Sequence, residues 1–269
     1  MDRSPVVAGR FYTADPRALA REVAGYLALA ETPEEAPTLL AMVPHAGYVF
    51  SGPVAGRTLG EARLAPLVVL LGPNHTGQGQ PLALWPSGRW TFPGGGLDVD
   101  AGLAGALLQA EPRLKADTAA HSQEHSLEVV LPFLAAANPQ AAIVPICVAE
   151  PRYAELEAVA ASLAGVLGAL GRPVSLVVSS DMSHFLDDAR ARRVDALALE
   201  PVLTLDPRGL YDTVRTQGIS MCGVLPMTLG LLVAKALGAA SARLAAYATS
   251  AAASGDTSRV VGYAGVLVR

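Results

Sequence analysis

The sequence predicts a single-domain α/β fold in which a mostly parallel central sheet is covered by helices on both faces. Three short apolar runs, at residues 39–43, 67–71 and 174–178, are each followed within a few residues by a histidine. The run at residues 67–71 does not alternate apolar with polar residues, which indicates a strand buried on both faces. Segments of helical texture separate the runs, as expected for parallel strands joined by crossover helices.

Composition narrows the class of protein. The 269 residues are 51% hydrophobic and 16% charged, which provides for a sizeable core and argues against disorder. The net charge of −4 and the lack of basic runs interleaved with aromatics argue against a nucleic-acid partner. Two cysteines cannot form a disulfide framework and the first residues lack a signal-peptide pattern, so a cytoplasmic location is expected.

One uncharged window, residues 129–149, is long enough to span a bilayer. Pro132, Pro145 and the turn-like residues 138–140 interrupt it. Because these breaks favour a helix end, a turn and a strand, we expect no membrane span.

The N-terminal half is expected to alternate between helices and strands after an opening segment. Asp15 and Pro16 start a helix that ends near residue 29, because aspartate accepts hydrogen bonds from free helix amides and proline suits the first turn. Residues 86–96, rich in glycine and proline, predict a hairpin or rim loop. Its aromatic residues either pack the edge of the cleft or cover the core, and the second is favoured. Further strands are expected at residues 39–43 and 67–71, followed by a flexible connection and an apolar stretch at residues 82–85, and further helices at residues 53–62 and 100–109.

The C-terminal half continues the alternation. Helices are expected at residues 124–137, 152–170, 187–200 and 206–215, with a last one that ends near residue 237. Strands are expected at residues 142–148, 174–180, 243–250 and 260–268, and a loop at residues 251–258. No internal repeat or linker divides the chain, so one domain spanning residues 1–269 is expected.

Histidines at the ends of strands suggest a metal site, because ligands bind at the carboxyl ends of the strands in open α/β sheets. One strand–helix–strand unit separates His45 from His75, which predicts neighbouring strands of a right-handed crossover. Neutral imidazole is the commonest metal ligand, so two at adjacent strand ends predict half of a site. The alternative is that each histidine is a structural plug bonded to a loop carbonyl.

Cys222 is a natural further ligand. It lies at the expected start of an apolar helix, where free amides lower a thiol pKa and favour the metal-binding thiolate; the alternative is an inert buried thiol. Asp181 and His184 share one loop, and a histidine oriented by a carboxylate can serve as general acid or base, although Asp181 could instead complete the metal shell. The absence of a Gly-x-Ser-x-Gly elbow disfavours a hydrolase.

A polar segment at residues 121–128 leaves two interpretations open. His121 and His125 are four residues apart, as are Glu124 and Glu128, so a helix would place each pair on one face. The order of these residues does not match the His-Glu-x-x-His zinc motif. The segment is either a polar helix start with Ser122 as cap or a stretch from which His125 reaches the cleft.

Five motifs in order resemble those of the Memo family, and the resemblance covers nearly the whole chain. They are PHAGY at residues 44–48, GPNH at 72–75, EHSLE at 124–128, SSDMSH at 179–184 and MCG at 221–223. The resemblance implies a fold similar to that of LigB-like class III extradiol dioxygenases, which hold iron(II) with two histidines and a carboxylate. It further implies that His45, His75 and Cys222 bind metal, with cysteine where a dioxygenase has a carboxylate, and that His184 is the general base beside Asp181. The pocket residues are then His125, Asn74 and Tyr48.

The function implied by this resemblance is metal-dependent oxidoreduction with iron or copper, or alternatively zinc, as cofactor. A runner-up hypothesis is a non-catalytic module that uses the dioxygenase-like cleft to bind a peptide or partner. The implied partners are a small molecule or peptide, with AMMECR-type and radical-SAM proteins as pathway partners, and neither nucleic acid nor membrane.

Overall fold

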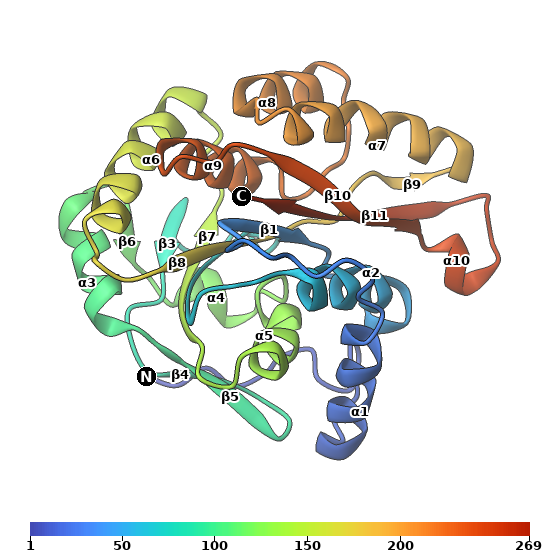
Figure 1. The fold of residues 1–269 in the computed structure, drawn as a ribbon, viewed down its shortest axis with the longest axis horizontal. Coiled ribbons are helices and arrows are strands. Elements are labelled where there is room, and N and C mark those ends of the chain that lie inside the picture. Colours follow the sequence, from blue (N-terminus) through green and yellow to red (C-terminus); the bar gives the residue numbers. More distant parts are fainter.

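One sheet of eleven strands organises the chain in the computed structural model, which describes residues 1–269 (Figure 1). The strands are β1 (Leu40–Val43), β2 (Leu67–Gly72), β3 (Leu82–Leu84), β4 (Arg89–Phe92), β5 (Gly95–Val99), β6 (Lys115–Ala116), β7 (Ala142–Val148), β8 (Val174–Ser179), β9 (His184–Leu186), β10 (Ala242–Thr249) and β11 (Val260–Val268). The main path runs β10-β11-β1-β8-β2-β7-β3-β6. The four central strands β1, β8, β2 and β7 are parallel, whereas β11 and β3 join them antiparallel. The predicted α/β class with a mostly parallel sheet is therefore confirmed.

Helices cover both faces of this sheet (Figure 1). They are α1 (Pro16–Leu27), α2 (Tyr48–Glu61), α3 (Ala101–Ala110), α4 (Ala119–Ser122), α5 (Leu131–Ala137), α6 (Tyr153–Gly168), α7 (Asp188–Leu203), α8 (Pro207–Thr216), α9 (Val224–Ala236) and α10 (Ala251–Ser254), with a 3₁₀ turn η1 (Glu128–Val130). Four of the longer helices begin at an aspartate whose carboxylate accepts a hydrogen bond from the first turn, as predicted at Asp15.

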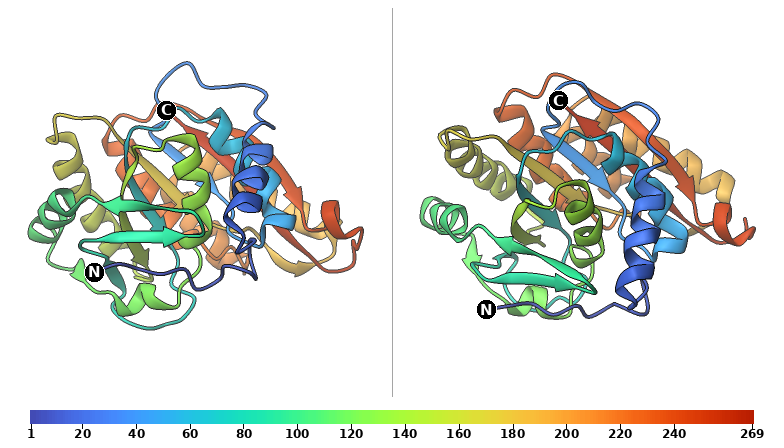
Figure 2. Two further views of the ribbon diagram at one scale, coloured as in Figure 1. Left: turned by 90° about the horizontal axis from the view of Figure 1, so that it is seen from below. Right: turned by 60° about the horizontal axis from the view of Figure 1, so that its bottom comes forward.

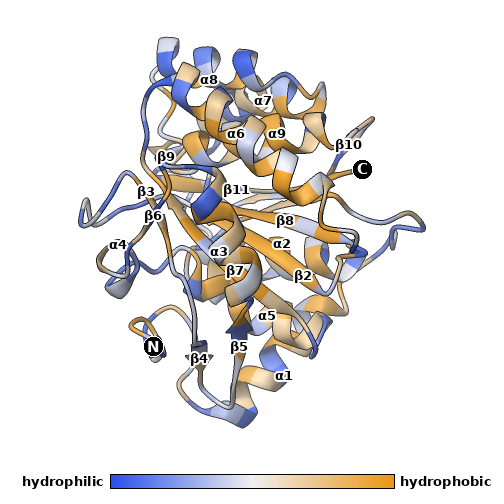
Figure 3. Cartoon of the chain, turned by 90° about the vertical axis from the view of Figure 1, so that its left-hand side faces the viewer, coloured by the Kyte–Doolittle hydropathy of each residue, from blue (hydrophilic) through white to orange (hydrophobic).

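The core has one layer on each face of the sheet. Within β1, Leu40 and Met42 pack into the layer with α6 and α9, while Ala41 and Val43 pack into the layer with α1 and α2. Successive side chains of a strand point to opposite faces, so a strand covered on both sides must be apolar throughout. Figure 3 shows this as a continuous band of hydrophobic strands between helices whose outer surfaces are hydrophilic.

The order of the strands corrects one prediction. β8 lies between β1 and β2 and pairs with both of them, so the strands that precede His45 and His75 are not neighbours. The crossover from β1 to β2 skips one position, which the later strand β8 fills. As a result, the loop at residues 180–183 emerges between the two histidine loops.

Three local predictions are also corrected. Helix α2 begins at Tyr48, not at residue 53, and contains Pro53, whose missing amide removes only one hydrogen bond near the helix start. Residues 124–127 are not helical, and η1 and α5 form only the remainder of the helix expected at 124–137. The expected loop at 251–258 contains the short helix α10.

The apolar window at residues 129–149 comprises the end of η1, α5, a turn and β7. No helix of the chain is long and apolar enough to cross a membrane. Residues 86–96 lie mostly in the β4–β5 hairpin, and Trp90 within it is buried in the core.

Candidate metal centre

The loops that follow β1, β2 and β8 meet at the carboxyl edge of the sheet. The Ser180 amide donates to the Val43 carbonyl at 2.8 Å, and the His45 amide donates to Asp181 Oδ1 at 2.8 Å. The loop after β8 is therefore bonded to the loop that carries His45. Because β8 lies between β1 and β2, it brings Asp181 into the same edge as both histidine loops.

Three histidines converge at this edge. Ring nitrogens of His45, His75 and His125 lie within 4.8 Å of one another, and this is the one group of three or more such donors in the chain. The ring centroids are 5.2 Å apart for His45 and His75, and 4.8 Å apart for His75 and His125. His125 comes from the irregular loop between α4 and η1, so its membership of this histidine cluster depends on tertiary structure.

Hydrogen bonds hold His45 in one tautomer. The Ser179 hydroxyl donates its single proton to the Ser126 carbonyl at 2.7 Å, so at its 2.6 Å contact with His45 it accepts from Nδ1–H. Burial, followed by the nearby rings of His125 and His75, lowers the pKa of His45 well below 6.5. His45 is therefore neutral, with its Nε2 lone pair available to a metal ion.

Glu124 orients the other two rings of the cluster. Its Oε1 accepts from His75 Nδ1 and from the Ser126 amide, both at 2.9 Å, and lies 3.4 Å from His125 Nδ1. Burial opposes its ionisation, but the hydrogen bonds and the charge of His75 outweigh burial and lower the pKa of Glu124 to about 2. A carboxylate that binds Nδ1 leaves Nε2 for the metal, so the chemistry of the donor set fits a metal ion.

Glu124 was missed as a site residue in the sequence. The available indication was its position directly before His125 in a polar segment, but pairing with His75 joins residues 49 positions apart. Local pattern cannot predict such a contact.

Cys222 borders the cluster through His45 alone. Its Sγ lies 3.3 Å from His45 Nε2 and accepts a hydrogen bond from the Asp181 amide at 3.2 Å. Burial, together with the charge of Asp181, raises the pKa of the Cys222 thiol. The expectation that a helix start lowers this pKa is therefore wrong. Helix α9 begins only at Val224, and desolvation of the thiolate outweighs the hydrogen bonds that Cys222 receives, such as the one from the Asp181 amide.

Ser220, and not Asp181, orients His184. The Ser220 carbonyl can only accept, so at 2.9 Å it binds the Nδ1–H of His184 and leaves Nε2 available to other groups. The His184 amide also donates to Ser220 Oγ at 2.8 Å. Asp181 is buried and accepts from the His45 amide, and burial raises its pKa. The predicted pairing of carboxylate and histidine in this loop is thus replaced by two separate contacts.

Asn74 and Tyr48 have structural roles beside the cluster. Asn74 Oδ1 accepts from the amides of Thr76 and Gly77, at 3.1 and 3.0 Å, and so folds the loop after His75. Tyr48 is 1% exposed and its hydroxyl donates to the Val129 carbonyl at 2.8 Å. Tyr48, which we expected to line the pocket, lies in the core.

His121 does not join the cluster. It is fully buried, its Nε2 lies 3.0 Å from the Ala83 carbonyl, and its Nδ1 lies 3.4 Å from Cys147 Sγ. Helix α4 ends at Ser122, so the helical face that His121 and His125 would share does not form. His121 is therefore a buried structural histidine, whereas His125 from the same segment reaches the cluster.

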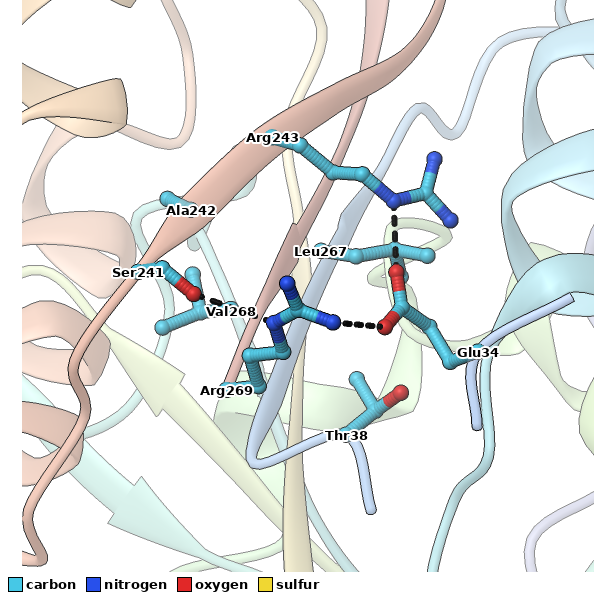
Figure 4. A pocket seen from close by; sticks show the side chains of 8 residues that line it. All are labelled: Glu34, Thr38, Ser241, Ala242, Arg243, Leu267, Val268 and Arg269. Carbon is cyan, nitrogen blue, oxygen red and sulfur yellow. Dashed lines mark hydrogen bonds and ion pairs between the residues drawn. The ribbon is translucent and has the colours of Figure 1, made fainter. Parts of the chain in front are cut away.

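A pocket near the C-terminus is lined by charged side chains that pair with one another. Figure 4 shows Glu34 between Arg243 and Arg269, with Ser241 bonded to Arg269. Arg243 also pairs with Glu61 at 2.7 Å. These charges satisfy one another and tie the loop before β1 to β10 and β11, so the histidine cluster is the stronger candidate site.

Comparison with known proteins identifies the family. The sequence profile described as "Memo-like protein" matches residues 3–267. A MEMO1 family protein of Methanopyrus kandleri is 38% identical, and the match covers 100% of this chain and 99% of that protein. MEMO1 family proteins of Archaeoglobus fulgidus and Aquifex aeolicus are 37% and 36% identical, covering 99% and 98% of this chain and the same shares of their own. The chain therefore belongs to the Memo family, as its five motifs predicted.

Proposed function

We propose that the protein binds one transition-metal ion through His45, His75 and His125, with Cys222 adjacent, and uses it in redox chemistry. The observation that carries the proposal is the convergence of three imidazole rings, with Nδ1 of His45 and His75 already bonded to other groups. Outer partners of this kind are typical of metal-binding histidines. Imidazole suits iron, copper and zinc, and a neighbouring thiol favours copper, zinc or iron.

The ion, His184 and Asp181 would each have a different role in the reaction. Bound at the cluster, the ion would supply redox chemistry or polarise a substrate oxygen. His184 Nε2 would accept a proton from substrate, because its Nδ1 is held by Ser220. Asp181 would keep the His45 loop in place through the His45 amide.

Elemental analysis of protein purified without added metal tests the ligand set. We expect roughly one transition-metal ion per chain, lost in His125→Ala and in His45→Ala. Cys147→Ala is the matched control for Cys222→Ala, since Cys147 is also a buried thiol but contacts His121 and the Ala120 carbonyl. Metal lost in Cys222→Ala but kept in His125→Ala would replace the three-histidine set by His45, His75 and Cys222. Metal retained in every variant would refute the site.

Metal affinity is expected to depend on pH through His75. Burial would lower the pKa of His75, but its hydrogen bond to Glu124 and the charge of Glu124 raise it above 6.5, whereas the pKa values of His45 and His125 are lowered. Below the raised pKa an ion must displace a proton from His75, so the logarithm of affinity should rise by about one per pH unit and then level off. Calorimetry in buffers of different ionisation enthalpy measures this proton. In Glu124→Gln the rise should move to lower pH, and an unchanged profile would contradict the account.

A further inference from the structure

The segment before α1 runs along the β4–β5 hairpin. Figure 2 shows it as an extended dark-blue ribbon that leads from the N-terminus to α1. The Arg3 amide donates to the Arg89 carbonyl at 2.8 Å, and the Thr91 amide donates to the Arg3 carbonyl at 2.9 Å. The backbone around Arg3 is therefore fixed against β4, and its side chain points into the protein, where Arg3 is 3% exposed.

The guanidinium of Arg3 binds three acceptors in the loop that carries His125. Nε donates to the His121 carbonyl at 2.9 Å, Nη2 to the Glu124 carbonyl at 2.5 Å, and Nη1 to Glu128 Oε2 at 2.8 Å. The planar group also lies 4.4 Å from the ring centroid of Trp90. One side chain thus holds the beginning, the middle and the end of the loop at residues 121–128.

Glu128, at the end of this loop, accepts hydrogen bonds from several groups of the same N-terminal segment. Its carboxylate accepts from the Val6 amide at 2.8 Å, the Val7 amide at 3.0 Å and the Tyr12 hydroxyl at 2.8 Å, as well as from Arg3. Glu128 and Arg3 are both almost fully buried. A buried ion pair with this many additional hydrogen bonds has a unique geometry.

The loop has little structure of its own to hold His125. Between the end of α4 at Ser122 and the start of η1 at Glu128, no residue is in a helix or strand. The ring of Phe11, from the N-terminal segment, packs against the His125 ring with centroids 4.8 Å apart. The Phe11 carbonyl also accepts from the Tyr48 amide at 2.8 Å, close to the His45 loop.

We propose that Arg3 and Glu128 are positioning residues, which make the N-terminal segment a clamp that sets Glu124 and His125 for metal binding. This rests on the proposed function, because it assumes that the histidine cluster is the metal site. Arg3 and Glu128 act on the ion only through the loop. Arg3 binds the His121 and Glu124 carbonyls and is itself held by Glu128. The Glu124 carboxylate in turn accepts from His75 Nδ1 and lies 3.4 Å from His125 Nδ1.

The test compares Arg3→Lys with Arg89→Lys. Lysine keeps the charge beside Glu128 but cannot reach three acceptors in a plane. We expect Arg3→Lys to weaken metal affinity by about 10- to 100-fold, the usual effect of losing an outer partner of a metal ligand. Arg89 lies in β4, next to Arg3, but its side chain bonds to Asp98 and Gly96 and not to the loop. Arg89→Lys should therefore bind metal with the affinity of the wild type. Equal affinity for the two variants would overturn the proposal.

Imidazole NMR signals of the metal-free protein supply a second readout. In Arg3→Lys the His125 signals should shift or broaden, while those of His184, held by Ser220, stay in place. Weakened affinity with unchanged His125 signals would overturn the positioning role and leave Arg3 a structural residue. If the wild-type protein binds no metal, the proposed function is wrong. The comparison of His125 signals between wild type and Arg3→Lys would still show whether Arg3 positions that ring.

Discussion

Replacing Glu124 by alanine is expected to lower the free energy of unfolding by about 3 kcal/mol and to abolish metal binding. The side chain is 1% exposed, and its removal leaves His75 Nδ1, the His75 amide and the Ser126 amide without their acceptor. It also leaves the protonated form of His75 without a counter-charge. Denaturant unfolding at neutral pH measures the loss of stability, and metal titration measures the loss of binding.

The control for this prediction is Glu157→Ala. Glu157 is exposed on α6 and makes no ion pair or side-chain hydrogen bond, so its removal should change stability by less than about 0.5 kcal/mol. If both variants unfold at the same denaturant concentration, the network around Glu124 contributes no net stability. Metal binding that survives in Glu124→Ala would show that the histidines need no carboxylate to orient them.

Replacing His184 by alanine is expected to slow turnover by about 10²- to 10⁴-fold while leaving the metal bound. His184 lies outside the group of three donors, and its Nδ1 is held by Ser220, so its free Nε2 is suited to proton transfer. The measurement is oxygen uptake by metal-loaded protein in the presence of a catechol or another reductant, with metal content determined on the same samples.

Ser220→Ala serves as the control for His184. It removes the hydroxyl that accepts from the His184 amide but keeps the carbonyl that orients the ring, so a much smaller decrease is expected. A rate unchanged in His184→Ala would exclude it as general base. If wild-type protein turns over neither oxygen nor catechol but binds a peptide saturably, the protein is a non-catalytic binding module.

Several features could be predicted from local sequence because they depend on local burial and capping. The strand at residues 142–148 was predicted with the bounds that β7 has, and the strands before His45 and His75 were found within one residue. A strand that is apolar at every residue is stable only when both of its faces are covered by other elements. The motifs in these loops were also sufficient to identify the family.

Only the tertiary structure decided which side chains meet. Strand order depends on a crossover that skips a position, so the sequence did not show that β8 separates His45 from His75. The loop at residues 121–128 has no periodicity, and its conformation is set by Arg3, whose partners lie 118 to 125 residues away. The sequence by itself determined the α/β architecture and placed histidines at the ends of its strands. Long-range hydrogen bonds and burial brought His125 and Glu124 to the site and raised the pKa of Cys222, because these effects depend on contacts that no local pattern encodes.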